Sequence, residues 1–223
     1  MRIINRDPGR VFEGFLHRIQ NEVYSELDSD LHTALIDKML PEFARFIPDP
    51  QTRLLDVGCG QGYASLKFKK LGYKQLTAVT FSNEDVEATI KRGITCYKMD
   101  MSFLGFDDKM FDALWVRHTL EHSPFPYLTL LEFNRVLVPG GFIYIEMPMP
   151  DTPRVLENWP NHYSIFGEKI WISLFERSEF KTIVKTALRF TLQIDDINGG
   201  SPFEQSNHVF VLQKKRDEAI ESL

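Results

Sequence analysis

A glycine-rich segment, residues 54–62, carries the clearest chemical signal in the sequence. Apolar residues around Asp56 predict a short buried strand, and Gly58, Gly60 and Gly62 follow at alternate positions before a helical run begins. Because glycine has no Cβ atom, the backbone can turn sharply here and a ligand can lie directly against it. The turn leads to a helix N-terminus, where unpaired N–H groups favour acceptor atoms and negative charge. The segment therefore predicts a nucleotide-type site beyond the carboxyl end of a strand in an open α/β sheet.

The glycine spacing narrows the kind of nucleotide. A dinucleotide fingerprint has glycines at the first, third and sixth places of its turn. Counting from Gly58, Gly60 takes the third place but Tyr63 takes the sixth, and the acid Asp56 precedes the glycines. This spacing speaks against a nicotinamide dinucleotide.

Three histidines lie where a side chain could exchange a proton with a substrate. His118 and His122 follow a predicted strand, and His162 lies in a loop over the expected cleft. Histidine suits general-base chemistry near neutral pH, although a single histidine in such a place is more often structural. His118 and His162 are the favoured catalytic candidates, and Glu146 either orients a substrate hydroxyl or caps a loop. No His/Cys/Asp cluster occurs at metal-ligand spacing, so no metal is expected from the sequence.

Length and composition bound the class of protein. The 223 residues are 43% hydrophobic and 26% charged, which is typical of one sizeable globular domain with small additions. The net charge of −5 offers no concentrated basic face for nucleic acid, and the basic residues 214–216 are interpreted as a solvated tail. We therefore expect a small-molecule substrate and no nucleic-acid partner.

Targeting signals and cysteine usage favour a cytoplasmic protein. No apolar run approaches the ~20 residues that span a bilayer, and residues 1–8 lack the apolar core of a signal peptide. The chain has two cysteines, one of them in the glycine turn, so a disulfide framework is not expected. The sequence leaves open whether the protein is a monomer or a homodimer.

The predicted elements divide the chain into a helical extension (1–50), a main domain (51–216) and a tail (217–223). In the extension, Phe12, Phe15, Leu16 and Ile19 share one helical face, and Pro41 is predicted to begin a last short helix. The extension either caps the active site or covers one face of the sheet. In the main domain, strands alternate with helices, which predicts an α/β, mainly parallel sheet with helices on both faces. The strands are predicted at 54–57, 76–79, 94–98, 111–116, 142–146, 181–188 and 208–213.

Several segments together resemble the class I S-adenosylmethionine-dependent methyltransferases. The run D-V-G-C-G-Q-G at 56–62 resembles motif I of that family, and residues 132–141 are similar to its E-x-x-R-V-L-x-P-G-G run. Residues 115–122 look like the segment after its fourth strand. Residues 162–166 and 174–180 resemble a small-molecule-modifying branch.

The resemblance implies a fold, a cofactor and a set of contacts. The family's Rossmann-like, doubly wound sheet has seven strands in the order 3-2-1-4-5-7-6 with strand seven antiparallel. Its cofactor is S-adenosyl-L-methionine. Carried over by position, the glycine turn would hold the methionine and ribose, Asp100 and Met101 the adenine, and Arg117 and His118 the sulfonium. The full set of implied cofactor contacts is Asp56, Gly58, Cys59, Gly60, Gly62, Thr80, Phe81, Ser82, Asp100, Met101, Arg117 and His118.

Two positions depart from the family pattern. Thr80 stands at the end of strand two, where the family usually has an acid that holds both ribose hydroxyls. A hydroxyl cannot offer the bidentate, charge-assisted acceptance of a carboxylate, so a weaker ribose contact is expected. Glu84 or Asp85 remains a candidate for that contact, although capping is the expected role of Asp85. Glu179 stands where the small-molecule branch usually has glycine.

The predicted function is methyl transfer to an O or N nucleophile of a small molecule, such as a sugar- or quinone-like metabolite. The reaction is an in-line displacement in which the enzyme chiefly orients the reactants and excludes water. One alternative is a methyltransferase-like domain that binds without turnover, which Thr80 motivates. A less favoured alternative is a nicotinamide-dependent oxidoreductase.

Overall fold

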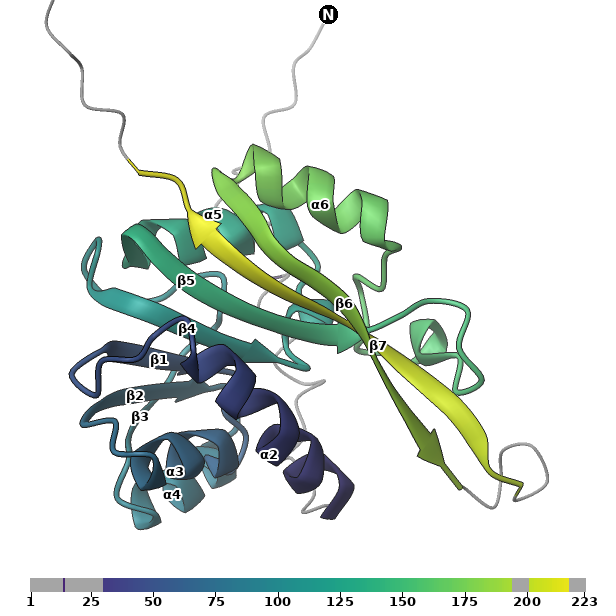
Figure 1. Cartoon of the computed structure of the whole chain (residues 1–223), viewed down its shortest axis with the longest axis horizontal. Coiled ribbons are helices and arrows are strands. Elements are labelled where there is room, and N and C mark those ends of the chain that lie inside the picture. The colour runs from purple at the N-terminus through teal and green to yellow at the C-terminus, as the bar shows by residue number, and fades with distance from the viewer. Residues whose placement is uncertain (1–13, 15–29, 194–200, 217–223) are drawn as a thin grey trace, which may run out of the picture.

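The computed structural model describes residue 14 and residues 30–193 and 201–216. One sheet of seven strands runs through this part of the chain in the order β3-β2-β1-β4-β5-β7-β6, with helices packed around it (Figure 1). Strands β1 to β5 are parallel, whereas β7 is antiparallel to both β5 and β6. The α/β fold, the strand order and the antiparallel seventh strand expected from the sequence are confirmed.

The strands and helices have the following bounds. The strands are β1 (Arg53–Val57), β2 (Gln75–Thr80), β3 (Thr95–Lys98), β4 (Phe111–Arg117), β5 (Leu137–Pro148), β6 (Phe180–Leu192) and β7 (Phe203–Lys214). The helices are α2 (Asp30–Ala44), α3 (Tyr63–Lys70), α4 (Asn83–Lys91), α5 (Pro126–Val136) and α6 (Glu168–Arg177), with short 3-10 turns η1 (Leu120–His122) and η2 (Leu156–Asn158).

Side-chain alternation along the central strand builds a separate core on each face of the sheet. On β4, Leu114 and Val116 pack with the apolar residues of α5 and α6, whereas Ala113 and Trp115 pack with those of α2 and α3. Successive side chains of a strand point to opposite faces, so a strand covered on both sides is apolar throughout. Trp115 is stacked on Tyr144 of β5, with ring centroids 4.0 Å apart.

Pro41 was predicted to begin a separate short helix, and this prediction is wrong. The helix α2 runs through Pro41 to Ala44. A proline inside a helix removes one hydrogen bond, but here Leu40 and Phe43 on either side are almost completely buried in the core. Their burial holds the helix together across the proline. The predicted apolar face of Phe12, Phe15, Leu16 and Ile19 lies outside the described residues.

Strands β5, β6 and β7 are longer than the sequence pattern predicts. Strand β5 begins at Leu137, which pairs with Phe111, and continues through the predicted glycine turn past a register shift. Such a register shift lets a strand continue through residues whose types predict a turn. At the other end of the sheet, residues 189–192 of β6 pair with residues 203–206 of β7, beyond the last pair of β7 with β5. This extension projects from the sheet as a two-stranded ribbon (Figure 1).

A buried carboxylate joins three strands at the end of the sheet where ligands bind in this class of fold. Glu146 of β5 is fully buried and accepts hydrogen bonds from Arg117 Nε at 3.2 Å, Tyr144 Oη at 2.7 Å and Asn207 Nδ2 at 2.8 Å. Burial alone would raise the pKa of this carboxyl, but Arg117, His118 and Tyr144 lower it well below its ordinary value. Glu146 is therefore ionised in the folded protein.

Replacing this carboxylate should destabilise the fold. In Glu146→Gln the buried Arg117 guanidinium loses its counter-charge, so we expect the free energy of unfolding in urea at pH 7 to fall by about 3–5 kcal/mol. The exposed Glu204, 3.8 Å from Arg189, provides a control, because Glu204→Gln should change stability by no more than about 0.5 kcal/mol.

The Glu146→Gln variant also tests how the free energy of unfolding depends on pH. The pKa of Glu146 is lowered on folding, so its contribution is present above the unfolded carboxyl pKa of about 4.3 and is lost as pH falls below that value. Wild-type stability should therefore drop more steeply than that of Glu146→Gln as pH falls below about 4.3. Equal acid slopes, or a Glu146→Gln protein as stable as Glu204→Gln, would contradict this account.

Candidate functional site

The glycine turn between β1 and α3 is fixed against the end of β2. The N–H groups of Gly58 and Cys59 both donate to the carbonyl of Val79, at 2.9 and 3.0 Å. Gly62 is the residue before α3 and has a left-handed backbone (φ 80°), which glycine adopts without strain. The turn therefore lies at the carboxyl edge of the sheet, where the sequence predicts the ligand.

Two of the three glycines are required by the protein's own packing. A Cβ atom on Gly58 would lie against the side chain of Thr119, and one on Gly62 would lie 2.8 Å from the side chain of Thr89. Gly60 is also left-handed (φ 49°), and its carbonyl accepts a hydrogen bond from Thr89 at 3.1 Å. The turn is thus packed tightly between Thr89 of α4 and Thr119, which directly precedes η1.

Asp56 supports the turn from inside. Its buried Oδ2 accepts from the N–H of Ser65 at 3.1 Å and from the Ser65 hydroxyl at 2.6 Å. These bonds join the end of β1 to the first turn of α3 across the glycines. The predicted contact of Asp56 with a bound cofactor stays a prediction.

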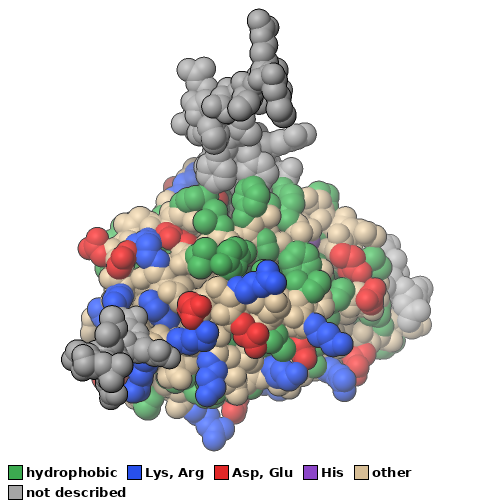
Figure 2. All heavy atoms as spheres, turned by 90° about the horizontal axis from the view of Figure 1, so that it is seen from above, with side chains coloured by type: hydrophobic (Ala, Val, Ile, Leu, Met, Phe, Trp, Pro, Cys, Tyr) green, Lys and Arg blue, Asp and Glu red, His purple; other side chains and the backbone are tan. Residues whose placement is uncertain are grey.

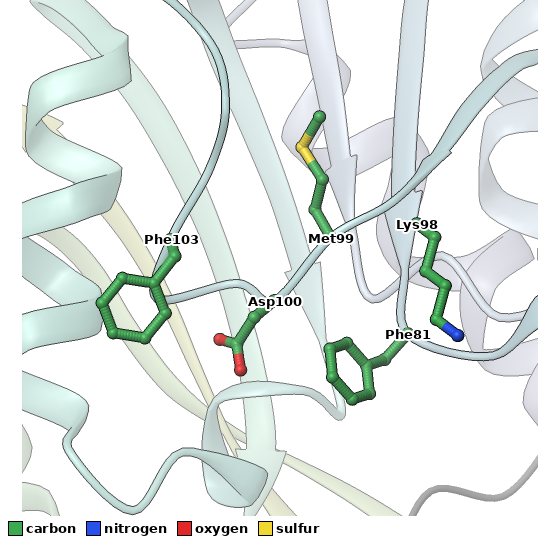
Figure 3. A pocket seen from close by; sticks show the side chains of 5 residues that line it. All are labelled: Phe81, Lys98, Met99, Asp100 and Phe103. Carbon is green, nitrogen blue, oxygen red and sulfur yellow. The ribbon is translucent and has the colours of Figure 1, made fainter. Parts of the chain in front are cut away.

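A pocket of about 440 Å³ lies beside this turn, at the ends of β2 and β3 (Figure 3). It is lined by Phe81, Lys98, Met99, Asp100 and Phe103. Phe81 and Asp100 were predicted from the sequence, whereas Lys98, Met99 and Phe103 were not. Two rings and a thioether beside one carboxylate suit a flat heterocycle that carries an amino group.

Three other residues that were predicted to contact the cofactor are not among the residues that line this pocket. Met101 packs against the apolar core and does not line the pocket. Ser82 caps α4 by accepting from the N–H of Asp85 at 3.3 Å. Thr80 is buried at the end of β2, and its carbonyl accepts from the N–H of Met99 at 3.1 Å.

His118 lies between two buried carboxylates. Its Nδ1 is 3.3 Å from Glu121 Oε1, and its Nε2 is 3.3 Å from Glu146 Oε1. Burial and the neighbouring Arg117 oppose protonation, but the two carboxylates raise the pKa of His118 overall. The residue also has a left-handed backbone (φ 47°), with its N–H donating to the carbonyl of Glu146 at 2.8 Å. His118 therefore holds η1 against β5.

Arg117 lies next to this pair. Its Nε donates to Glu146, and its buried Nη2 has no hydrogen-bond partner among the described residues. A donor therefore remains there for an acidic group of a ligand.

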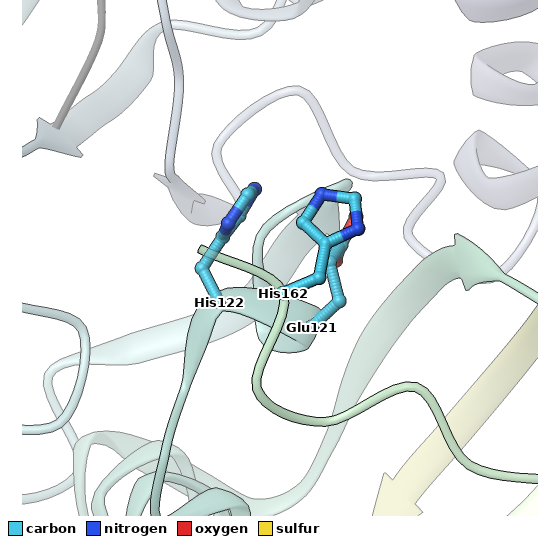
Figure 4. A group of neighbouring side chains, drawn as sticks. All are labelled: Glu121, His122 and His162. Atoms are coloured by element: carbon cyan, nitrogen blue, oxygen red, sulfur yellow. The ribbon is translucent and has the colours of Figure 1, made fainter. Parts of the chain in front are cut away.

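Glu121, His122 and His162 form a second group, which the sequence did not reveal. One possible ligand atom from each lies within 4.8 Å of the others (Figure 4). The loop that carries His162 is held in place because the N–H groups of Tyr163 and Ser164 both donate to the carbonyl of Glu121, at 2.9 and 3.0 Å. His122 and His162 are far apart in the sequence, and no spacing rule links them.

No helix in the part of the chain that the structure describes is both long and apolar enough to cross a membrane.

Comparison with known proteins agrees with this geometry. Residues 55–145 match the family model described as a methyltransferase domain. The chain is 29% identical over 125 residues to 27-O-demethylrifamycin SV methyltransferase of Amycolatopsis mediterranei, covering 47% of this chain and 45% of that protein. It is 28% identical over 162 residues to ubiquinone biosynthesis O-methyltransferase of Xanthomonas oryzae pv. oryzae, covering 66% of this chain and 65% of that protein. The chain thus spans about half to two thirds of the length of these curated relatives.

The fold is shared with solved structures. A methyltransferase of Bacillus halodurans C-125 superposes with a TM-score of 0.67 at 15% identity, covering 78% of this chain and 99% of that chain. The strand order, the glycine turn that follows Asp56 and the matching domain model agree with one another. Over residues 55–145 the chain is therefore similar to the methyltransferase domain family, and it has the fold of solved methyltransferase structures.

Proposed function

We propose that this protein transfers a methyl group from S-adenosyl-L-methionine to an oxygen or nitrogen of a small molecule. The observation that carries the proposal is the pocket of Phe81, Met99, Asp100 and Phe103 beside the glycine turn. The rings and thioether provide flat apolar walls for adenine, and the Asp100 carboxylate can accept from its exocyclic amine. The residues present therefore fit the adenosine part of this cofactor.

Residues at the carboxyl edge of the sheet can also bind the ribose and the methionine part of the cofactor. The glycine turn, which has no Cβ atom at positions 58, 60 and 62, suits the ribose and methionine, and Arg117, whose Nη2 has no hydrogen-bond partner among the described residues, can donate to the methionine carboxylate. When bound, the cofactor supplies a methyl group on a positively charged sulfur. The chain's contribution is to hold the acceptor in line with that methyl group and to exclude water.

We assign the proton-accepting role to His162 rather than His118. Both nitrogens of His118 lie against carboxylates, so this residue positions Glu121 and Glu146. Nδ1 of His162 lies 2.8 Å from the carbonyl of Leu156, which can only accept, so the ring lone pair is on Nε2. Burial also lowers the pKa of His162 and keeps the ring neutral. Nε2 of His162 would take the acceptor's proton as the methyl carbon leaves the cofactor's sulfur and bonds to the acceptor oxygen.

A small, uncharged or weakly charged acceptor fits the surface. The net charge is −5, and on the face drawn in Figure 2 basic and acidic side chains are interspersed. The two curated relatives are named for a rifamycin and for ubiquinone biosynthesis, which supports a sugar- or quinone-like acceptor with a hydroxyl group.

A second candidate function is a methyltransferase-like domain that binds the cofactor without turnover. Thr80 favours it, because this buried residue ends β2 where the family usually has the acid that holds the ribose. The two candidates differ in product formation and agree on cofactor binding.

Cofactor binding is tested with S-adenosylhomocysteine by calorimetry. We expect micromolar-range binding to the wild type and loss of binding in Gly60→Ala, because alanine is strained in the left-handed backbone (φ 49°) that Gly60 adopts in the turn. Gly167→Ala is the matched control, since a Cβ atom there meets nothing within 4 Å and should leave the affinity unchanged. No binding to the wild type would refute the proposal, and near-normal affinity of Gly60→Ala would refute the placement.

Turnover is tested by release of S-adenosylhomocysteine across a panel of sugar and quinol acceptors. With an accepted hydroxyl substrate, His162→Gln should lower kcat by about 10²–10⁴-fold while leaving the affinity for S-adenosylhomocysteine unchanged, because only the base is removed. His208→Gln removes a histidine from β7 and should keep the wild-type kcat. An unchanged kcat in His162→Gln would exclude it as the base. Binding without any product across the panel would support the binding-only function.

A further inference from the structure

We propose that Glu121, His122 and His162 form a binding site for a divalent transition metal ion, zinc being the best match. Two imidazoles and one carboxylate are a ligand set that zinc uses in catalytic sites, where a fourth position stays open to water or substrate. The three side chains come from η1 and from the loop after η2, and Figure 4 shows them converging.

The hydrogen bonds of the two histidines select the nitrogen that would bind the metal. His122 Nδ1 lies 2.9 Å from the carbonyl of Asn161, and His162 Nδ1 lies 2.8 Å from the carbonyl of Leu156. A carbonyl can only accept, so each Nδ1 carries the proton and each Nε2 has the lone pair. This is the outer contact that metal-bound histidines commonly make, and it fixes both the tautomer and the ring orientation.

The carboxylate of Glu121 provides the second observation. Its side chain is only 1% exposed, and its Oε2 has no hydrogen-bond partner among the described residues. The other oxygen, Oε1, lies 3.3 Å from Nδ1 of His118. A buried carboxylate oxygen without a partner is costly, and a cation bound between the two histidines would satisfy it.

The site must contract slightly to hold zinc. Ligand atoms about 2.0–2.1 Å from a tetrahedral zinc lie about 3.3 Å from one another, whereas here they are spread over up to 4.8 Å. Rotation of the partly exposed His122 and His162 rings can close this difference. The ring of Trp159 stacks on His162, with the ring centroids 5.2 Å apart.

A bound metal would change the chemistry of the acceptor site. The metal and a proton compete for the same Nε2 lone pair of His162, so the metal-loaded protein offers the acceptor a Lewis acid in place of a base. This consequence rests on the proposed function, whereas binding of the ion itself does not.

The test uses the full chain, treated with a chelator and then titrated with Zn²⁺ or Co²⁺ alone. We expect one equivalent to bind, with Co²⁺ giving the intense visible d–d absorption of a four-coordinate site. His122→Gln and His162→Gln should each weaken binding by more than about tenfold and reduce that absorption, whereas His208→Gln should bind as the wild type does.

Two results would overturn the proposal. One is the absence of stoichiometric binding to the wild type. The other is an unchanged affinity and spectrum in both His122→Gln and His162→Gln. Binding of S-adenosylhomocysteine to the chelator-treated protein tests the proposed function separately, because the adenosine pocket shares no residue with the metal site.

Discussion

The ionised, fully buried carboxylate of Glu146 is the constraint on which the arrangement of the side chains between β5 and η1 depends. It holds Arg117 of β4 and Asn207 of β7 against β5, and it lies against one nitrogen of His118. The other nitrogen of that ring lies against Glu121. Neighbouring charged groups therefore connect Glu146 of β5, through His118, to Glu121 of η1. Because Arg117, Glu121 and Glu146 are buried, each of these charges must keep its partner.

Much of the fold could be predicted from the sequence because local patterns and global packing agree there. The alternation of strands with helices predicted a mainly parallel sheet with helices on both faces, and the resemblance to the methyltransferases implied the strand order and the antiparallel seventh strand. The errors arose where distant contacts decide the outcome. Pro41 stays within α2 because the residues around it are buried, and β5 starts early because Leu137 pairs with Phe111. Neither contact leaves a signal in the local sequence.

In the candidate site, too, some residues could be assigned from the sequence and others depend on distant contacts. Phe81 and Asp100 were assigned to the cofactor by the resemblance, and both line the pocket, while their contact with a cofactor stays a prediction. Met101 was also assigned to the adenine by the resemblance; Met99 and Met101 both pack against the core, and Met99 and Phe103 line the pocket. The group of Glu121, His122 and His162 depends on how a loop folds back over η1, which no residue spacing records.

The contact of Thr119 with Gly58 has a mechanical consequence. The threonine side chain fills the space where any larger residue at position 58 would place its Cβ atom, and its hydroxyl donates to the carbonyl of Val57 at 3.1 Å. The glycine turn and the start of η1 therefore cannot slide past each other. A displacement of the turn would therefore press on Thr119, which directly precedes the 3-10 turn that carries Glu121 and His122.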